Sequence, residues 1–351
     1  MIQAGGIPMQ NASPPSEART PAARRCTLAL ALLLADAPLT SQRLCQINHQ
    51  PCQEAEADLS HLVGEMMRYH ALHLSYHPRQ GYRLYGSAYE WRLCLLHWLQ
   101  RGMRLAPGVS EAQLFSALQQ VAPTLQPEAC LARFAALLDQ HTTLPCFTFT
   151  PRQKQLVGLM LLFASLQQQR HPLTSLLPCW LPDIHRRALQ QKCEYGCAGA
   201  LCQILFDRLD PELRQQEQLF TTLMLSLLKN HAATPRDNDQ DRTLMQEVEE
   251  SVERVEACSG IRFPQREQLC SRLFAHLGAA IERARFGIRI GTPLLAELEL
   301  HHPGLLTLTR DSIAGLEHHY RIRFSPEELS LIAVSLGAWL MQAGKLQETA
   351  T

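Results

Sequence analysis

Hydrophobic residues recur at spacings of three and four along most of the chain, which is the pattern of amphipathic helices. In the last third of the chain, Leu244, Val248 and Val252 follow this spacing. Strand-like alternation is almost confined to two short segments, 71–76 and 81–86. The pattern therefore predicts a mainly α protein with one β hairpin.

The elements near the N-terminus come in an informative order. We expect a first helix over about 24–35, a second over 42–46 and a third from 52 to about 70. The hairpin follows directly, with its turn at 77–80. Three helices followed by a hairpin predict a winged helix-turn-helix, whose third helix would enter the major groove of DNA.

The third predicted helix has an unusual charge for a DNA-reading element. Its first turns contain Glu54, Glu56 and Asp58, whose carboxylates would be repelled by DNA phosphates. Glutamate can, however, accept a hydrogen bond from cytosine. Two interpretations stay open: contact with nucleic acid, or a retained scaffold whose binding has decayed. The candidate DNA-contacting residues are Arg43, Gln53, Arg68, Arg79 and Arg83.

A length of 351 residues predicts two or three domains. Thr150-Pro151 is a plausible helix start, and the stretch after His231 is polar and poor in large apolar groups. The predicted divisions are a flexible arm (1–20), the winged helix-turn-helix (21–90), a helical connector (91–140), a first helical block (141–231), a linker (232–242) and a second helical block (243–345).

Composition narrows the class of protein. Hydrophobic residues make up 46% and charged residues 19%, which excludes wholesale disorder and collagen-like repeats. The 33 basic residues balance 33 acidic ones, so the formal net charge is zero. Bulk basic charge cannot hold nucleic acid here, and any such contact must come from a local patch.

The twelve cysteines are scattered through helix-like segments, which is not typical of a secreted disulfide scaffold. We expect reduced thiols that pack as small hydrophobic groups in a cytoplasmic protein. Cys193, Cys197 and Cys202 are spaced by four and five, which places them on one helical stripe and favours packing over metal binding. No metal or cofactor is expected.

Membrane association is not expected, because no apolar run reaches the ~18–20 residues that span a bilayer. Arg24-Arg25 followed by the apolar stretch 26–35 resembles a secretory signal. The stretch lies more than twenty residues into the chain, however, and Asp36 follows it directly. We interpret it as a first buried helix.

Several motifs carry a resemblance to a known family. The hairpin is similar to the wing of bacterial sugar-operon regulators that contain phosphotransferase-system regulation domains (PRDs), and the second helical block resembles the PRD itself. Its motifs are a histidine seven residues before an arginine (His276 and Arg283), a glycine-led stretch (287–295), His302-Pro303 and the closing-helix segment 332–338.

The resemblance implies a transcriptional regulator with two PRDs, of which the first (141–231) has diverged. Such proteins dimerise and are phosphorylated on histidines by an HPr-like phosphocarrier. The four histidine positions of the family fall here on Phe163, Ser226, His276 and Ser335, and only His276 keeps an imidazole. One residual phosphorylation site, or none, is therefore expected.

His276 is the candidate phosphorylation site on its geometry as well. It falls at the edge of the apolar stripe of its helix, with Arg272 and Arg283 on the same side. A phosphoryl group there would find cationic neighbours. The alternative is a hydrogen-bonded histidine at the boundary of a helical bundle.

Catalysis is not expected. The nucleophile-elbow, P-loop, dinucleotide-binding and zinc-protease motifs are all missing from the sequence. The leading hypothesis is a cytoplasmic, homodimeric PRD-type transcriptional regulator. The second is a non-catalytic protein-interaction scaffold that has lost DNA binding and phosphorylation control.

Overall fold

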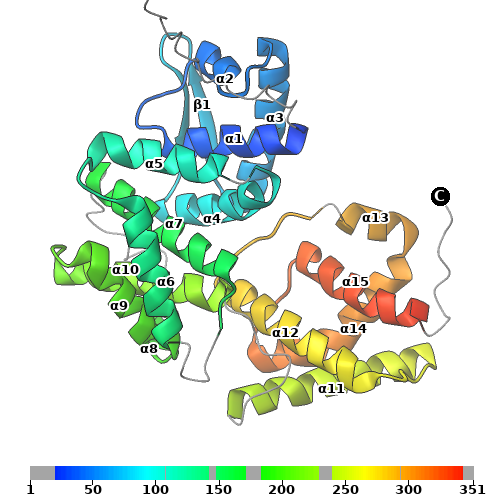
Figure 1. Cartoon of the computed structure of the whole chain (residues 1–351). Coiled ribbons are helices and arrows are strands. Elements are labelled where there is room, and N and C mark those ends of the chain that lie inside the picture. Colours follow the sequence, from blue (N-terminus) through cyan, green and yellow to red (C-terminus); the bar gives the residue numbers. More distant parts are fainter. Residues whose placement is uncertain are drawn as a thin grey trace, which may run out of the picture.

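The structure is a computed structural model that describes residues 20–106, 108–141, 148–170, 183–228, 239–292 and 294–342. Over these residues it contains fifteen helices and one two-stranded sheet (Figure 1), which confirms the mainly α class. The predicted N-terminal arm lies outside the described residues, apart from Thr20.

The N-terminal unit, called here the headpiece, has its elements in the predicted order. They are α1 (Pro21–Leu34), α2 (Ser41–Asn48), α3 (Cys52–His70), β1 (His73–His77) and β2 (Gly81–Tyr85). The two strands are antiparallel, with Ser75 opposite Arg83. Leu39, in the loop after α1, pairs with Tyr82 of β2, so the hairpin is attached to the helices through the backbone.

Local capping explains where the headpiece helices begin and end. The hydroxyls of Thr20 and Thr40 accept from backbone N–H groups at the starts of α1 and α2. His49 ends α2 in the left-handed conformation at φ 53°, which turns the chain into α3. The apolar stretch that resembles a secretory signal is the buried α1, with Leu28 fully covered.

The headpiece shares one hydrophobic core with six of the next seven helices; Leu189 of α8 belongs to a separate small cluster. This core includes Leu28 of α1, Trp98 of α4 and Phe134 of α6, and it continues to Leu228. The seven helices are α4 (Ala88–Leu105), α5 (Val109–Val121), α6 (Pro127–His141), α7 (Pro151–Arg170), α8 (Asp183–Gln190), α9 (Glu194–Phe206) and α10 (Pro211–Leu228).

The second helical block has its own core, which runs from Leu244 to Leu340. Its helices are α11 (Asp239–Ser259), α12 (Arg266–Arg285), α13 (Leu294–His301), α14 (Pro303–Tyr320) and α15 (Pro326–Gln342). The helix α11 includes the last four residues of the predicted linker (232–242). Asp239 and Asp241 fall in its first turn, where carboxylates stabilise the helix dipole.

Two groups of five helices share most of their helix pairs. We call α6–α10 the first bundle and α11–α15 the second bundle. In the first bundle α6 packs on α7 and α9, and α10 packs on α7, α8 and α9. In the second bundle α11 packs on α12 and α14, and α15 packs on α12, α13 and α14. By this pairing α6, which was expected in the connector, corresponds to α11.

The headpiece also contacts the second bundle. The guanidinium of Arg68, near the end of α3, lies 3.1 Å from a carboxylate oxygen of Glu327 in the first turn of α15. Arg289 donates to the backbone carbonyl of Arg68 at 3.2 Å, and Tyr89 of α4 donates to the carbonyl of Phe286. The C-terminal end of α3 is therefore held against the second bundle.

The structure departs from the expected all-reduced cysteines at one place. Cys45 of α2 and Cys52 of α3 form a disulfide across the turn, with Cα atoms 5.2 Å apart. The left-handed His49 turns the chain between them and brings the two helix ends together. Within the described residues, no helix combines the length and apolar character needed to cross a membrane.

Candidate functional site

His276 lies on α12 at the face that α15 covers. Its side chain is 22% exposed, and its Nε2 atom lies 3.5 Å from Oε1 of Glu328. The predicted apolar stripe of α12 is buried, including Leu273 and Leu277, and His276 sits at its edge as the helical spacing required. The imidazole is thus partly open to solvent and faces a carboxylate.

Glu328 is the centre of this cluster. Ser325 caps α15 by accepting from the Glu328 N–H, which fixes the position of this residue in the first turn. The guanidinium of Arg283 donates two hydrogen bonds to Glu328, at 2.9 and 2.7 Å. Burial alone would raise the pKa of Glu328, but the hydrogen bonds from Arg283 and the contact with His276 outweigh it and lower that pKa.

The two predicted phosphate neighbours have different surroundings. Arg283 shares the carboxylate of Glu328 with His276, so these two candidates are brought together. Arg272 is exposed and lies over the ring of Trp339, with its guanidinium carbon 5.8 Å from the ring centroid. Among the described residues Arg272 has no carboxylate within ion-pair distance, so its charge stays available one turn from His276.

This arrangement can respond to a charge added at His276. A phosphoryl group brings about −1.5 to −2 charges and three acceptor oxygens. Placed on the imidazole, it would compete with Glu328 for Arg283 and would attract Arg272. Because Glu328 is only 3% exposed, it cannot lose Arg283 without a change in its own surroundings.

The other three family positions differ sharply in exposure. Ser335 of α15 is half-buried, and its hydroxyl donates to the carbonyl of Leu331 at 3.1 Å. In the first bundle Phe163 is 3% exposed and Ser226 is fully buried. The Ser226 hydroxyl has no hydrogen-bond partner among the described residues. These two positions belong to the core and are closed to a phosphocarrier.

The predicted DNA-contacting residues are spread over α2, α3 and the hairpin. Arg43 and Gln53 are exposed on either side of the α2–α3 turn, and Arg79 is exposed in the hairpin turn. Arg68 lies fifteen residues after Gln53, which is about 22 Å along a helix, and it is paired with the second bundle. Arg83 points from β2 into a cavity that is described below.

The acidity of α3 is smaller at the surface than its sequence indicates. Asp58 is buried and receives a hydrogen bond of 2.7 Å from the Arg24 side chain. Glu54 and Glu56 stay exposed. From Gln53 to Gly64, the other exposed positions of α3 carry neutral or small groups, namely Gln53, Ala57, Ser60, His61 and Gly64.

In the described part of the chain, no three histidine, cysteine or acidic side chains gather as they would to hold a metal ion. Cys197 and Cys202 are buried on α9, as their helical spacing indicated, whereas Cys193 is exposed. Burial raises the pKa of each buried thiol to about 12, so both stay protonated. Protonated, buried thiols serve packing.

Sequence reasoning missed the importance of Glu327 and Glu328. The sequence Ser325-Pro326-Glu327-Glu328 is typical of a helix start, and the backbone N–H of Glu328 does take part in the cap. The side chains of the two glutamates point to different partners, Arg68 and Arg283. These partners are 259 and 45 residues away in the chain, so helix periodicity carried no signal for either.

Comparison with known proteins agrees with this site. A family described as the PRD domain matches residues 249–339, which contain His276, Arg283 and Glu328. The chain is also 30% identical to the stationary phase-inducible protein CsiE of Escherichia coli (strain K12) over 346 residues. That match covers 97% of this chain and 79% of the relative. The chain therefore belongs to the family of CsiE, with a PRD in its C-terminal part.

Proposed function

We propose that the protein is a cytoplasmic, non-catalytic transcriptional regulator of the PRD type. The headpiece would bind DNA as a winged helix-turn-helix, in a homodimer. His276 would be the residual site of phosphorylation by an HPr-like phosphocarrier of the phosphotransferase system. CsiE is named for its induction in stationary phase, and we place this protein in the same growth phase.

The observation that carries the proposal is a continuous set of contacts between His276 and α3. His276 contacts Glu328, and the neighbouring Glu327 contacts Arg68 of α3. Both glutamates lie in the first turn of α15. A change at His276 therefore reaches the helix that would read DNA through a single helical turn.

The charges along these contacts predict what phosphorylation of His276 would change. A phosphoryl group on His276 repels Glu328 and draws Arg283 away from it. The buried Glu328 then loses the contacts that stabilise its charged form, and the first turn of α15 must rearrange. Glu327 moves with that turn and releases Arg68, so phosphorylation would free the end of α3. This is a two-state device driven by local electrostatics.

The shared helix pairing supports a duplicated regulation domain. Each bundle has a long helix, α7 or α12, packed on a closing helix, α10 or α15. The family histidine positions lie on these helices in both bundles. We infer that α6–α10 are a diverged copy of α11–α15 that no longer accepts a phosphoryl group.

A scaffold without DNA binding is the second candidate function. The exposed carboxylates Glu54 and Glu56 and the engaged Arg68 favour it. A scaffold would use the headpiece only as a packed extension of the first bundle, with which it shares a core. Binding to DNA separates the two functions.

The test is a salt titration of binding to generic duplex DNA. If Arg43 and Arg79 each contact a phosphate, Arg43→Ala and Arg79→Ala weaken binding and each lower the log–log salt slope by about 0.9. Arg310→Ala is the matched control, because Arg310 is an exposed arginine of the second bundle. A flat salt response in the wild type would refute DNA binding and favour the scaffold.

A further inference from the structure

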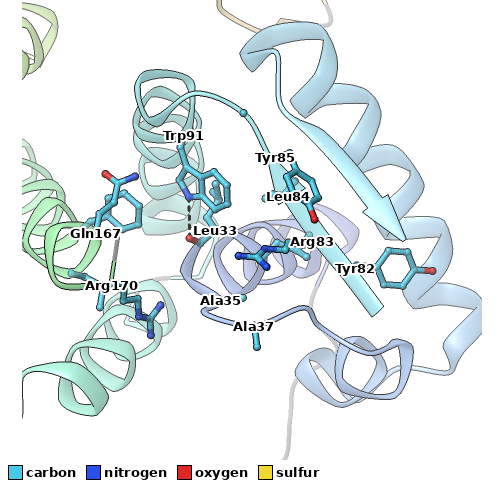
Figure 2. Close-up of a pocket in the computed structure, with 14 residues that line it drawn as sticks. Leu33, Ala35, Ala37, Tyr82, Arg83, Leu84, Tyr85, Trp91, Gln167 and Arg170 are labelled. Carbon is cyan, nitrogen blue, oxygen red and sulfur yellow. Dashed lines mark hydrogen bonds between the residues drawn. The ribbon is translucent and has the colours of Figure 1, made fainter. Parts of the chain in front are cut away.

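A cavity of about 260 Å³ lies where the headpiece meets the first bundle (Figure 2). Its walls come from the end of α1, from β2, from α4 and from α7. Most of the lining is apolar, including Leu33, Trp91, Phe163 and Leu166. The volume equals that of about nine water molecules in the liquid, which is room for one ring or a short chain with a polar head.

The polar side chains that line the cavity present hydrogen-bond donors. Oε1 of Gln167 accepts from Arg92 at 2.8 Å, so its amide NH₂ is the part left for an occupant. Arg83 and Arg170 add two guanidinium groups, which carry donors only. Trp91 already donates its ring N–H to the Leu33 carbonyl at 3.0 Å.

The two arginines are not neutralised by the lining. None of the described residues that form the cavity wall carries a carboxylate. Among the described residues, Arg83 has no ion-pair partner, and its guanidinium lies 5.9 Å from the Tyr85 ring centroid. The nearest carboxylate to Arg170 is that of Asp36, 4.0 Å away, on a side chain that is 63% exposed.

Arg170 has a buried hydrogen-bond donor for which the described residues of the cavity wall provide no acceptor. Its side chain is only 8% exposed, and one of its terminal nitrogens donates to the Leu34 carbonyl. Its Nε atom is buried, lies 4.0 Å from Oδ1 of Asp36, and has no hydrogen-bond partner among the described residues. Buried donors of a charged group normally find an acceptor, because leaving one unpaired is costly. Figure 2 shows Arg83 and Arg170 approaching the space beside Ala35 from opposite sides.

We propose that this cavity is a binding site for a small organic anion, with one carboxylate or monophosphate group on an apolar body of about one ring. The anionic group lies between Arg83, Arg170 and the Gln167 amide. The apolar body lies against Trp91, Phe163 and Leu33. The occupant therefore joins β2 of the headpiece to α7 of the first bundle.

The site gives the diverged first bundle a role that does not involve phosphorylation. Phe163, which stands at a family histidine position, supplies part of the apolar wall. An anion bound at Arg83 also withdraws that guanidinium from the surface of the hairpin. Binding of the anion itself does not depend on DNA binding, so the two proposals fail separately.

Isothermal titration of the full-length protein with benzoate and with phenyl phosphate at physiological ionic strength tests the site. Benzyl alcohol and inorganic phosphate are the controls, because each carries only half of the proposed ligand chemistry. We expect one or both organic anions to bind at least tenfold more tightly than either control. Whichever of benzoate and phenyl phosphate binds more tightly identifies the preferred acid group.

Single-residue variants then test whether the anion binds in this cavity. Arg83→Gln and Arg170→Gln should each weaken it at least fivefold, and Ala37→Phe should abolish it by filling the cavity from its exposed rim. Arg79→Gln is the matched control, since Arg79 lies on the same hairpin and does not line the cavity. Ala37→Phe keeps both arginines, so it stays informative if Arg170→Gln does not fold.

Three results would overturn the proposal. The first is the absence of binding by both organic anions. The second is binding of benzyl alcohol as tight as that of the anions, which would show that the arginines contribute nothing. The third is binding that survives both Ala37→Phe and Arg83→Gln, because the occupied site would then lie elsewhere.

Discussion

The two helical bundles share most of their helix pairs but differ in what they expose. In the first bundle the family histidine positions, Phe163 and Ser226, are sealed in a core that continues into the headpiece. In the second bundle His276 is 22% exposed and Ser335 is half-buried. The first bundle thus buries both of these positions, whereas the second keeps a partly exposed imidazole.

The cause of the difference is visible in the long helix of each bundle. Every residue from Leu156 to Leu166 of α7 is buried, because α4, α5, α6, α9 and α10 all pack against that helix. By contrast α12 keeps exposed and half-buried positions between its buried ones. A helix that is apolar on all sides is a core element, and an amphipathic one has a surface on which a modification can act.

The largest expected effect concerns the buried ion pair that joins α4 to the first bundle. Arg92 of α4 and Glu217 of α10 are both about 1% exposed and lie 2.6 Å apart. Arg92→Ala leaves a buried carboxylate unpaired and should lower the free energy of unfolding by about 3–5 kcal/mol. In the second bundle, the surface pair of Arg266 and Glu253 should contribute less than about 1 kcal/mol. Urea unfolding of Arg92→Ala and Arg266→Ala measures both, and equal losses would contradict the comparison.

Placing histidine at the family positions should give the next largest difference in stability between the two bundles. Ser226 is fully buried, so Ser226→His overfills the core and buries a polar ring, at a cost of about 2–4 kcal/mol. Ser335→His places its ring at a half-buried position and should cost less than about 1 kcal/mol. The measurement is again urea unfolding. A Ser226→His variant as stable as Ser335→His would mean that the first bundle is not sealed.

As the pH falls, the headpiece should lose stability at a higher pH than the second bundle does. His70 of α3 and His97 of α4 have nitrogens 3.3 Å apart, and burial lowers their pKa values from 6.5 to about 3 and about 4. The unfolded chain binds protons below pH 6.5 that the folded one cannot bind, so stability is complete above pH 6.5 and falls as the pH drops.

By pH 5.5 each histidine should cost about 1.4 kcal/mol of stability. The lowered pKa of Glu328 gives a stabilisation that is lost only as the pH falls below its ordinary value of 4.5. Urea unfolding at pH 7.5 and 5.5 checks this, with His70→Gln expected to show a smaller pH dependence. Stability that is unchanged between these pH values would contradict the buried, neutral pair.

The smallest expected effect on stability belongs to the contact between the headpiece and the second bundle. The Arg68 side chain is 63% exposed, so Glu327→Gln should change the free energy of unfolding by less than about 1 kcal/mol. If the contact restrains α3, the same variant should raise affinity for duplex DNA by up to about fivefold, which corresponds to that energy. Unchanged or weaker DNA binding by Glu327→Gln would show that the contact does not restrain the headpiece.

Much of this architecture was predictable, because helical spacing and caps are local. The order of the headpiece elements, the buried α1 and the edge position of His276 all follow from residues close in sequence. Glu328 and the donors of the cavity were not predictable, because their partners come from distant elements. Arg83 is an example: it is exposed on the hairpin, as a DNA-contacting residue must be, but its second position in the lining of a cavity with α7 was not predictable.

The central claim is that one responsive site remains, at His276 of the second bundle. Incubation with a phosphorylated HPr-like phosphocarrier, followed by mass analysis at alkaline pH, tests it most directly. We predict a single acid-labile phosphoryl group on the wild type and on the matched Ser335→Ala variant, and none on His276→Ala. A wild type without the adduct, or a His276→Ala variant that still carries it, would contradict the claim.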